Sequence, residues 1–186
     1  MNKFRNILLF FILVLSVLPC LAQVPVGKDM LFVYNLRTQY RRFSVSFQER
    51  GDTLQLDWAL PRDGKIQRGS YAMSPENRQH AVQICYIMPA PDSLIETPAS
   101  ELFAMLSTDA LRDVRSTGKC RYNNTVLEIV GTSVPSAVEP AKSLIHLKDF
   151  DEGYEMWVRD DERFPLIEKM INNPVEIDWE VKGVDN

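Results

Sequence analysis

Strict alternation of apolar and polar side chains constrains this chain more than any other feature. Apolar residues fall at every second position over residues 43–47 and again over 54–60, and the two runs flank Gly51-Asp52. Successive side chains of a β-strand point to opposite faces, so each run predicts a strand with one buried and one solvent-facing side. A glycine-containing turn between two such runs predicts an antiparallel hairpin.

The last alternating run, over residues 175–181, has the clearest separation of faces. Val175, Ile177, Trp179 and Val181 are separated only by charged residues. A shift of this strand by one position would bury those charges, so its register is strongly specified. We therefore expect residues 175–181 to form one strand whose apolar face lies in the core.

Two short helices are predicted between the strands. The first begins at Ser74, a residue type that caps helix N-termini, and runs to about Tyr86. The second begins at Ser107 and ends at Gly118, because glycine closes helices in the left-handed conformation. The other apolar segments predict further strands, over residues 31–36, 66–73, 119–122, 125–130, 143–147, 154–158 and 164–171.

These elements predict an α+β protein with a mainly antiparallel curved sheet, folded into a partial barrel or a sandwich, and two short helices. Antiparallel sheets accommodate one solvent-facing side, which agrees with the alternation. The chain after its first 22 residues has a length that suits one domain, over residues 23–186. We find no internal repeat or linker in its sequence.

The first 22 residues have the pattern of a secretory signal peptide. Lys3 and Arg5 precede an apolar run over residues 7–18, and small residues lead to a predicted cleavage after Ala22. The run is too short to span a bilayer, which takes about 20 apolar residues. The sequence therefore predicts a protein exported to the periplasm or cell envelope, with no transmembrane segment in the mature chain.

Cys20 offers an alternative form of processing. Lipoprotein signals end at a cysteine that is lipidated and becomes the mature N-terminus, which would tether the protein to a membrane. The residue before that cysteine is normally small, and Pro19 fits this position poorly. We therefore expect a soluble exported protein rather than a lipid-anchored one.

Cys85 and Cys120 are the only cysteines after the predicted cleavage site. An oxidising compartment permits a disulfide between them. The alternative is a pair of buried thiols that pack as small apolar side chains. The sequence leaves both states open, because it does not give the Cα separation that a disulfide requires.

A series of structural motifs runs through most of the mature chain. It comprises a hairpin ending in Leu56-Asp57-Trp58, the stretch 69–74, a helical middle and a closing strand pair that includes 164–167 and 177–181. In this order the motifs resemble a group of exported bacterial proteins of unknown function. The expected architecture also resembles, in fold alone, the curved-sheet lipoprotein-carrier proteins of the cell envelope. That second resemblance implies an apolar ligand.

Charge and missing motifs argue against several classes of function. Residues 1–22 hold two of the 21 Lys and Arg residues and none of the 25 acidic ones, so the net charge without them is −6. An acidic chain is unsuited to general nucleic-acid binding, which needs a clustered positive surface. The sequence also lacks zinc-ligand spacings, a phosphate-binding glycine loop and a GxSxG nucleophile motif. We expect no cofactor and no metal.

A few residues still merit attention as carriers of chemistry. His80 and His146 are the only histidines, and we interpret both as surface or edge residues. Trp157 falls outside the main apolar stripe, and an exposed aromatic ring could stack on a sugar or contact a partner. Acidic loop residues could bind calcium, although solvated turns are the simpler interpretation; they are Asp149, Asp151, Glu152, Asp160, Asp161 and Glu162.

We therefore expect an exported, non-enzymatic protein of the bacterial envelope that binds an apolar small molecule or another envelope component. The reason is that a curved sheet leaves a concave apolar face, and such faces are common binding sites. Two alternatives stay open. One is a carboxylate-dependent hydrolase without assignable catalytic residues. The other is a protein-interaction module without a small-molecule site.

Overall fold

The computed structural model describes residues 29–36, 39–86, 90–133 and 136–183. The predicted signal peptide and Cys20 lie outside these residues. The two alternating runs form the strands β2 (Gln39–Arg50) and β3 (Thr53–Arg62), which pair as the expected antiparallel hairpin. Buried and more exposed residues alternate along both strands, so their apolar sides share one face.

One strand joins the two halves of the main sheet. β1 (Met30–Leu36) pairs with β2 on one side and with the last strand, β13 (Ile177–Gly183), on the other. Beyond β3 the sheet continues through β4 (Lys65–Met73) to the short edge strand β6 (Leu94–Glu96). Beyond β13 it continues through β12 (Ile167–Ile171), β11 (Glu155–Arg159), β10 (Leu144–Lys148), β9 (Thr125–Ser133) and β8 (Lys119–Tyr122).

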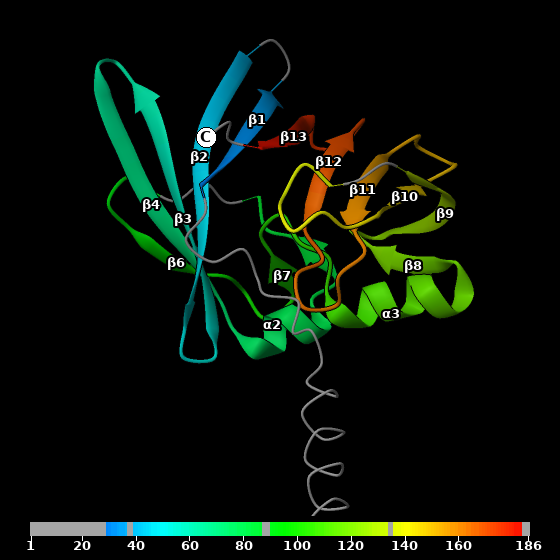
Figure 1. Cartoon of the computed structure of the whole chain (residues 1–186). Coiled ribbons are helices and arrows are strands. Elements are labelled where there is room, and N and C mark those ends of the chain that lie inside the picture. The colour runs from blue at the N-terminus through cyan, green and yellow to red at the C-terminus, as the bar shows by residue number, and fades with distance from the viewer. Residues whose placement is uncertain (1–28, 37–38, 87–89, 134–135, 184–186) are drawn as a thin grey trace, which may run out of the picture.

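This eleven-stranded sheet is not closed into a barrel, because its edges β6 and β8 are not paired with each other. Every neighbouring pair is antiparallel except β4 and β6. The mainly antiparallel sheet with two helices is thus confirmed for the described residues, and the sheet is open. In Figure 1, β2 to β4 stand on one side and β10 to β12 on the other, with β7 (Glu101–Leu102) between them.

The pairing of Trp58 with Gly69 shows why β4 carries a glycine in its middle. The two residues face each other across β3 and β4. A side chain at Gly69 would place its Cβ 2.7 Å from the Trp58 ring, which is closer than non-bonded carbon atoms approach. The absent side chain therefore lets the indole lie against the neighbouring backbone.

The first helix, α2 (Pro75–His80), begins at the predicted Ser74 cap. The Ser74 hydroxyl accepts a hydrogen bond from the Asn77 N–H at 3.1 Å, and the Asn77 side chain accepts one from the Ser74 N–H at 3.0 Å. This is a capping box in which asparagine replaces the usual Glu or Gln. The helix start is therefore set by the residues that the sequence indicated.

The predicted continuation of this helix to Tyr86 is wrong. The chain becomes extended and forms β5 (Gln83–Ile84), which pairs in parallel with β7. The N–H groups of Val82 and Gln83 both donate to the Ser100 carbonyl, at 3.0 and 3.2 Å. Pairing with a segment distant in sequence thus replaces the next helical turn.

The second helix, α3 (Thr108–Thr117), agrees with its prediction at both ends. The Ser107 hydroxyl accepts a hydrogen bond from the Ala110 N–H, and Gly118 closes the helix with a φ of 78°. Its buried residues are Ala110, Leu111 and Val114, and this face packs against β8. Among the described residues, no helix is long and apolar enough to cross a membrane.

The closing strand begins two residues later than the alternation predicts, at Ile177, and runs on to Gly183. Trp179 and Val181 are buried as expected, but Val175 is 49% exposed and precedes the strand. Glu176 has a φ of 57°, which interrupts the extended conformation. The expectation that all four apolar residues of this run face the core is therefore wrong for Val175.

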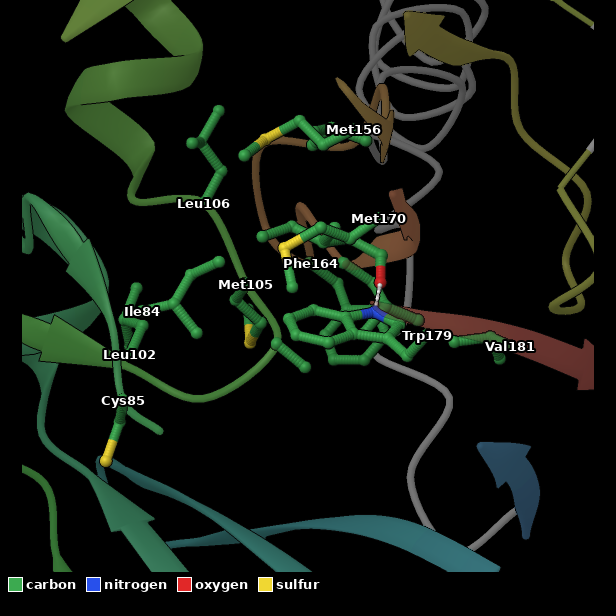
Figure 2. Close-up of a cluster of buried hydrophobic side chains, with 14 of the residues drawn as sticks. Ile84, Cys85, Leu102, Met105, Leu106, Met156, Phe164, Met170, Trp179 and Val181 are labelled. Carbon is green, nitrogen blue, oxygen red and sulfur yellow. Dashed lines mark hydrogen bonds between the residues drawn. The ribbon is translucent and has the colours of Figure 1, made fainter. Parts of the chain in front are cut away.

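Trp179 lies at the centre of the core that β13 shares with the middle of the chain. Met105, Phe164 and Met170 gather around its indole (Figure 2). The Trp179 Nε1–H donates to the Ile167 carbonyl at 2.8 Å, which satisfies its polar atom. Buried residues from the sheet and from the segment before α3 thus form one core.

Candidate functional site

The face of the sheet that carries its buried side chains, which we call the inner face, continues beyond the main core. A small cavity of about 80 Å³ lies against this part of the inner face. Residues of β1, β2 and β13 line one side of it, and residues 84–86 and 103–104 line the other. We call this cavity the aromatic pocket. Its lining residues are Tyr34, Arg41, Phe43, Ile84, Cys85, Tyr86, Phe103, Ala104, Ile177 and Trp179.

Strand register brings the aromatic side chains of the pocket together. Tyr34 is paired with Trp179 across β1 and β13, and Phe43 lies diagonally across from Tyr34 on the same face of β2. The Tyr34 ring packs edge-on against Phe43 with centroids 5.1 Å apart, and its centroid lies 5.6 Å from that of Trp179. Such arrangements are favourable for aromatic rings.

Ala104 contributes a small side chain where the covering segment crosses the pocket. It is buried and has a φ of 53°, a left-handed conformation that is uncommon outside glycine. The Ala104 carbonyl accepts a hydrogen bond from the Ile167 N–H at 2.9 Å. This contact fixes the covering segment to β12.

The Tyr34 hydroxyl is the distinctive polar atom of the pocket. It is buried and has no hydrogen-bond partner among the described residues. Burial, with smaller effects from Tyr71 and Tyr86, raises the pKa of Tyr34 well above its usual value, so the hydroxyl keeps its proton. A buried hydroxyl without a partner costs free energy, which a hydrogen-bonding ligand would recover.

Arg41 is the cation of the pocket lining. It lies directly opposite Tyr34 in the β1–β2 ladder and is half-buried. Its Nη2 donates to the Gln39 Oε1 at 3.0 Å, and no described carboxylate pairs with it. Arg41 was not identified from the sequence. It precedes Phe43 and Val45 at the two-residue spacing of the inner face, but it is charged where they are apolar. That break in the apolar series was the available signal.

A second hollow of about 420 Å³, which we call the amide groove, adjoins the aromatic pocket. Both are lined by Ile84 and Tyr86. The Tyr86 hydroxyl accepts hydrogen bonds from the side-chain amides of Asn123 at 3.1 Å and Asn173 at 2.5 Å. Tyr86 therefore has its ring in the apolar site and its hydroxyl in the polar one.

A larger hollow, about 770 Å³, is a shallow depression on the solvent-facing side of β2, β3 and β4, and most of its lining residues are polar. Its central carboxylate, Asp57, already accepts hydrogen bonds from Gln55 at 2.6 Å and Ser70 at 2.5 Å. Because these polar groups satisfy one another in an open surface, the smaller apolar pocket is the better candidate for a binding site.

Neither histidine lines the aromatic pocket. His80 lies on the surface with its Nδ1 2.7 Å from the Asp109 Oδ2. His146, on β10, has its Nε2 2.7 Å from the Glu155 Oε2. His80 is thus at the surface, as interpreted from the sequence, whereas His146 is half-buried on a strand that is not at an edge of the sheet.

Trp157 is half-buried on the outer face of β11. The His146 ring on β10 stacks on it with centroids 4.2 Å apart, and the Lys169 Nζ on β12 lies 4.7 Å from its centroid. Since β10 and β12 flank β11, these two side chains cover opposite sides of the indole. Its ring faces are therefore already occupied by neighbours.

The acidic loop residues serve as turn and ion-pair partners. Asp149 is buried and accepts hydrogen bonds from the Thr125 hydroxyl at 2.6 Å and the Asp151 N–H at 2.9 Å. Asp160 binds the Arg115 guanidinium of α3 at 2.6 Å. Across the described ranges, no group of three or more His, Cys, Asp or Glu side chains is placed to hold a metal ion.

Of the two states left open for Cys85 and Cys120, the structure holds both residues as buried thiols. Cys85 lies in the aromatic pocket and Cys120 lies on β8. Burial, with a smaller effect of Asp113, raises the pKa of Cys120 to about 12, so this thiol stays protonated at neutral pH.

The contact between β10 and β11 predicts a dependence of stability on pH. Hydrogen bonds from Lys148 at 2.9 Å and from His146 hold the pKa of Glu155 below its usual value of 4.5. The folded state therefore favours the charged carboxylate. This stabilisation is present above about pH 4.5 and is lost as the pH falls through the lower pKa of the folded state.

We expect the difference in free energy of unfolding between the wild type and Glu155→Gln to shrink between about pH 6 and about pH 3. Urea unfolding of both proteins at the two pH values measures this difference. Glu152→Gln, at an exposed acid of the preceding turn, is the matched control. A difference for Glu155→Gln that is equal at both pH values would contradict this assignment.

Comparisons with known proteins identify no relative of this chain. A scan against protein-family models finds no match, and neither a search of curated proteins nor a search of solved structures finds one. Inference about function therefore starts from the geometry of the site.

Proposed function

We propose that the mature chain is an exported, non-enzymatic binding protein of the bacterial envelope. Its ligand is a small amphipathic molecule whose apolar end enters the aromatic pocket. The observation that supports this proposal is the pocket itself, a small apolar cavity lined by aromatic rings next to a polar groove. Ligand sites commonly combine an apolar lining with a few polar groups in this way.

The volume of the pocket limits the size of the apolar group. An apolar cavity of about 150 Å³ holds benzene, and the aromatic pocket offers about 80 Å³. A short alkyl group suits this space. The polar end of the ligand would lie where the pocket meets polar groups, which Arg41 and the neighbouring amide groove supply. An apolar ligand is also what the resemblance to lipoprotein-carrier proteins implies.

Binding is a better proposal than catalysis for this pocket. Its described lining residues include no histidine, aspartate or glutamate that could act as a general base. The amide groove adds one carboxylate, Glu101, which accepts a hydrogen bond from the Gln83 side chain at 3.1 Å. Hydrolysis by paired carboxylates needs a second acid facing the first.

The test is calorimetric titration with the neutral probe pentan-1-ol. We expect wild type to bind it and Ile177→Trp to bind it at least about tenfold more weakly, because a larger side chain at this half-buried lining position fills the pocket. Val130→Trp, at a position that is 42% exposed on β9, is the matched control and should bind as wild type does. Equal binding by Ile177→Trp would contradict the proposal.

A further inference from the structure

Two hydrogen-bond donors meet at the wall of the aromatic pocket. Tyr34 and Arg41 are direct partners in the antiparallel ladder of β1 and β2, and both line the pocket. Side chains opposite each other on one face of such a pair have Cβ atoms about 4.5–5.5 Å apart. A single ligand group can therefore contact both side chains.

Both side chains have donor capacity to spare. The Tyr34 hydroxyl is buried and makes no hydrogen bond to a described residue. The Arg41 guanidinium, which carries five N–H donors, makes one hydrogen bond to a described side chain, the neutral Gln39 amide at 3.0 Å. Ion pairs among the described residues do not include Arg41. The pair therefore presents a hydroxyl donor and an uncompensated positive charge.

The surroundings favour an anionic group at this point. The described lining of the aromatic pocket contains no acidic residue that would repel a carboxylate. The chain as a whole has a net charge of −4, so any preference for an anion must arise locally. A carboxylate accepts hydrogen bonds from arginine and from a hydroxyl at the same time, and charge-assisted bonds of this kind are the strong ones.

We propose that the ligand of the aromatic pocket is a short-chain carboxylic acid. Its carboxylate binds the Arg41 guanidinium and the Tyr34 hydroxyl, and its alkyl chain lies against the Phe43 and Trp179 rings. This proposal rests on the proposed function, because it names the chemical class of the ligand that the same pocket receives.

Three probes of equal chain length test the charge of the ligand: pentanoate, pentan-1-ol and pentylamine. Calorimetric titration of the mature wild type should give the highest affinity for pentanoate and the lowest for pentylamine. Arg41→Gln should weaken pentanoate binding by about tenfold or more, since a charge-assisted hydrogen bond is lost. The same variant should weaken pentan-1-ol binding much less, because that probe carries no charge.

Arg42→Gln is the matched control. Arg42 is the next residue of β2, is exposed, and points to the opposite face of the sheet. The Arg42→Gln substitution removes one positive charge, as Arg41→Gln does, but leaves the pocket lining unchanged. Pentanoate should therefore bind this variant as it binds wild type. Tyr34→Phe, which keeps the ring and removes the hydroxyl, should also weaken pentanoate binding.

The outcomes separate this proposal from the one it rests on. Equal affinity of wild type for pentanoate and pentan-1-ol, or equal pentanoate binding by wild type and Arg41→Gln, would overturn the carboxylate assignment while leaving the apolar pocket supported. Failure of wild type to bind any of the three probes would overturn both. Urea unfolding of each variant verifies that a loss of binding does not reflect a loss of fold.

Discussion

Arg159→Met is expected to lower the free energy of unfolding by about 3–5 kcal/mol, the cost of removing one partner from a buried charge network. The Arg159 side chain is fully buried in β11. Its Nη1 donates to the Ser136 hydroxyl at 2.9 Å and to the Val138 carbonyl at 2.7 Å, and its Nη2 donates to the Pro140 carbonyl at 2.5 Å. One guanidinium thus fixes the loop after β9 to the sheet.

The substitution would leave two buried carboxylates without their cation. Asp161 lies 3.7 Å from the Arg159 Nε, and Glu168 lies 3.9 Å from its Nη1. Burial already raises the pKa of Glu168, against the opposing effects of hydrogen bonds from Ser136 and Ala137 and of the Arg159 charge. Without Arg159 that pKa rises further, so part of the cost is the uptake of a proton.

Urea unfolding at neutral pH measures this effect. Arg121→Met, at an exposed arginine of β8, is the matched control and should change stability by less than about 0.5 kcal/mol. The triple variant with Asp161→Asn and Glu168→Gln should recover part of the loss, because no charge of this network is then left buried. If Arg159→Met had the same free energy of unfolding as the wild type, the network would not stabilise the fold.

Phe164→Ala is expected to cost about 3–5 kcal/mol, the range for truncating a buried phenylalanine. Phe164 is fully buried and precedes β12 in one half of the sheet. Its ring packs edge-on against Phe47 of β2 in the other half, with centroids 4.8 Å apart and an interplanar angle of 85°. The contact therefore links the two halves across the shared core.

Thermal or urea unfolding of Phe164→Ala measures this cost, with Phe150→Ala as the matched control. Phe150 is 64% exposed, so its truncation should change stability by less than about 0.5 kcal/mol. Phe164→Leu should lose less than Phe164→Ala, because it leaves a smaller cavity. Similar losses in the two alanine variants would mean that the halves of the sheet do not depend on this contact.

Local patterns in the sequence predicted the elements that local physics determines. Period-two alternation identified β2 and β3, because burial of one face specifies both the strand and its register. Capping residues identified α3 at both ends. These signals are sufficient where each element carries its own apolar face and its own end residues.

The errors arose where turns or distant contacts overrode the pattern. Val175 is apolar and falls in phase with β13. However, its N–H donates to the Asn173 side chain at 2.8 Å, and the Glu176 N–H donates to the Asn173 carbonyl at 2.8 Å. This asparagine-based turn delays the strand to Ile177. Helix α2 likewise ends early because β5 pairs with a segment that follows it by almost twenty residues.

The aromatic pocket could be predicted only in part. Sequence patterns placed Tyr34, Phe43 and Trp179 on predicted strands, and we expected a concave apolar face. These patterns did not indicate which segment covers that face, because residues 84–86 and 103–104 reach it through contacts distant in sequence. The role of Arg41 depends on that cover, so the break in the apolar series at Arg41 could not by itself assign it to a binding site.

Methyl NMR of residues 23–186 titrated with pentanoate tests most directly whether this pocket binds an apolar group. Ile84, Ala104 and Ile177 bring methyl groups to the lining, whereas Val126 and Ile129 are exposed on β9. We expect saturable shift changes at the three lining residues and none at the two on β9. Changes at the β9 residues alone, or no change at any methyl group, would contradict a ligand site in the aromatic pocket.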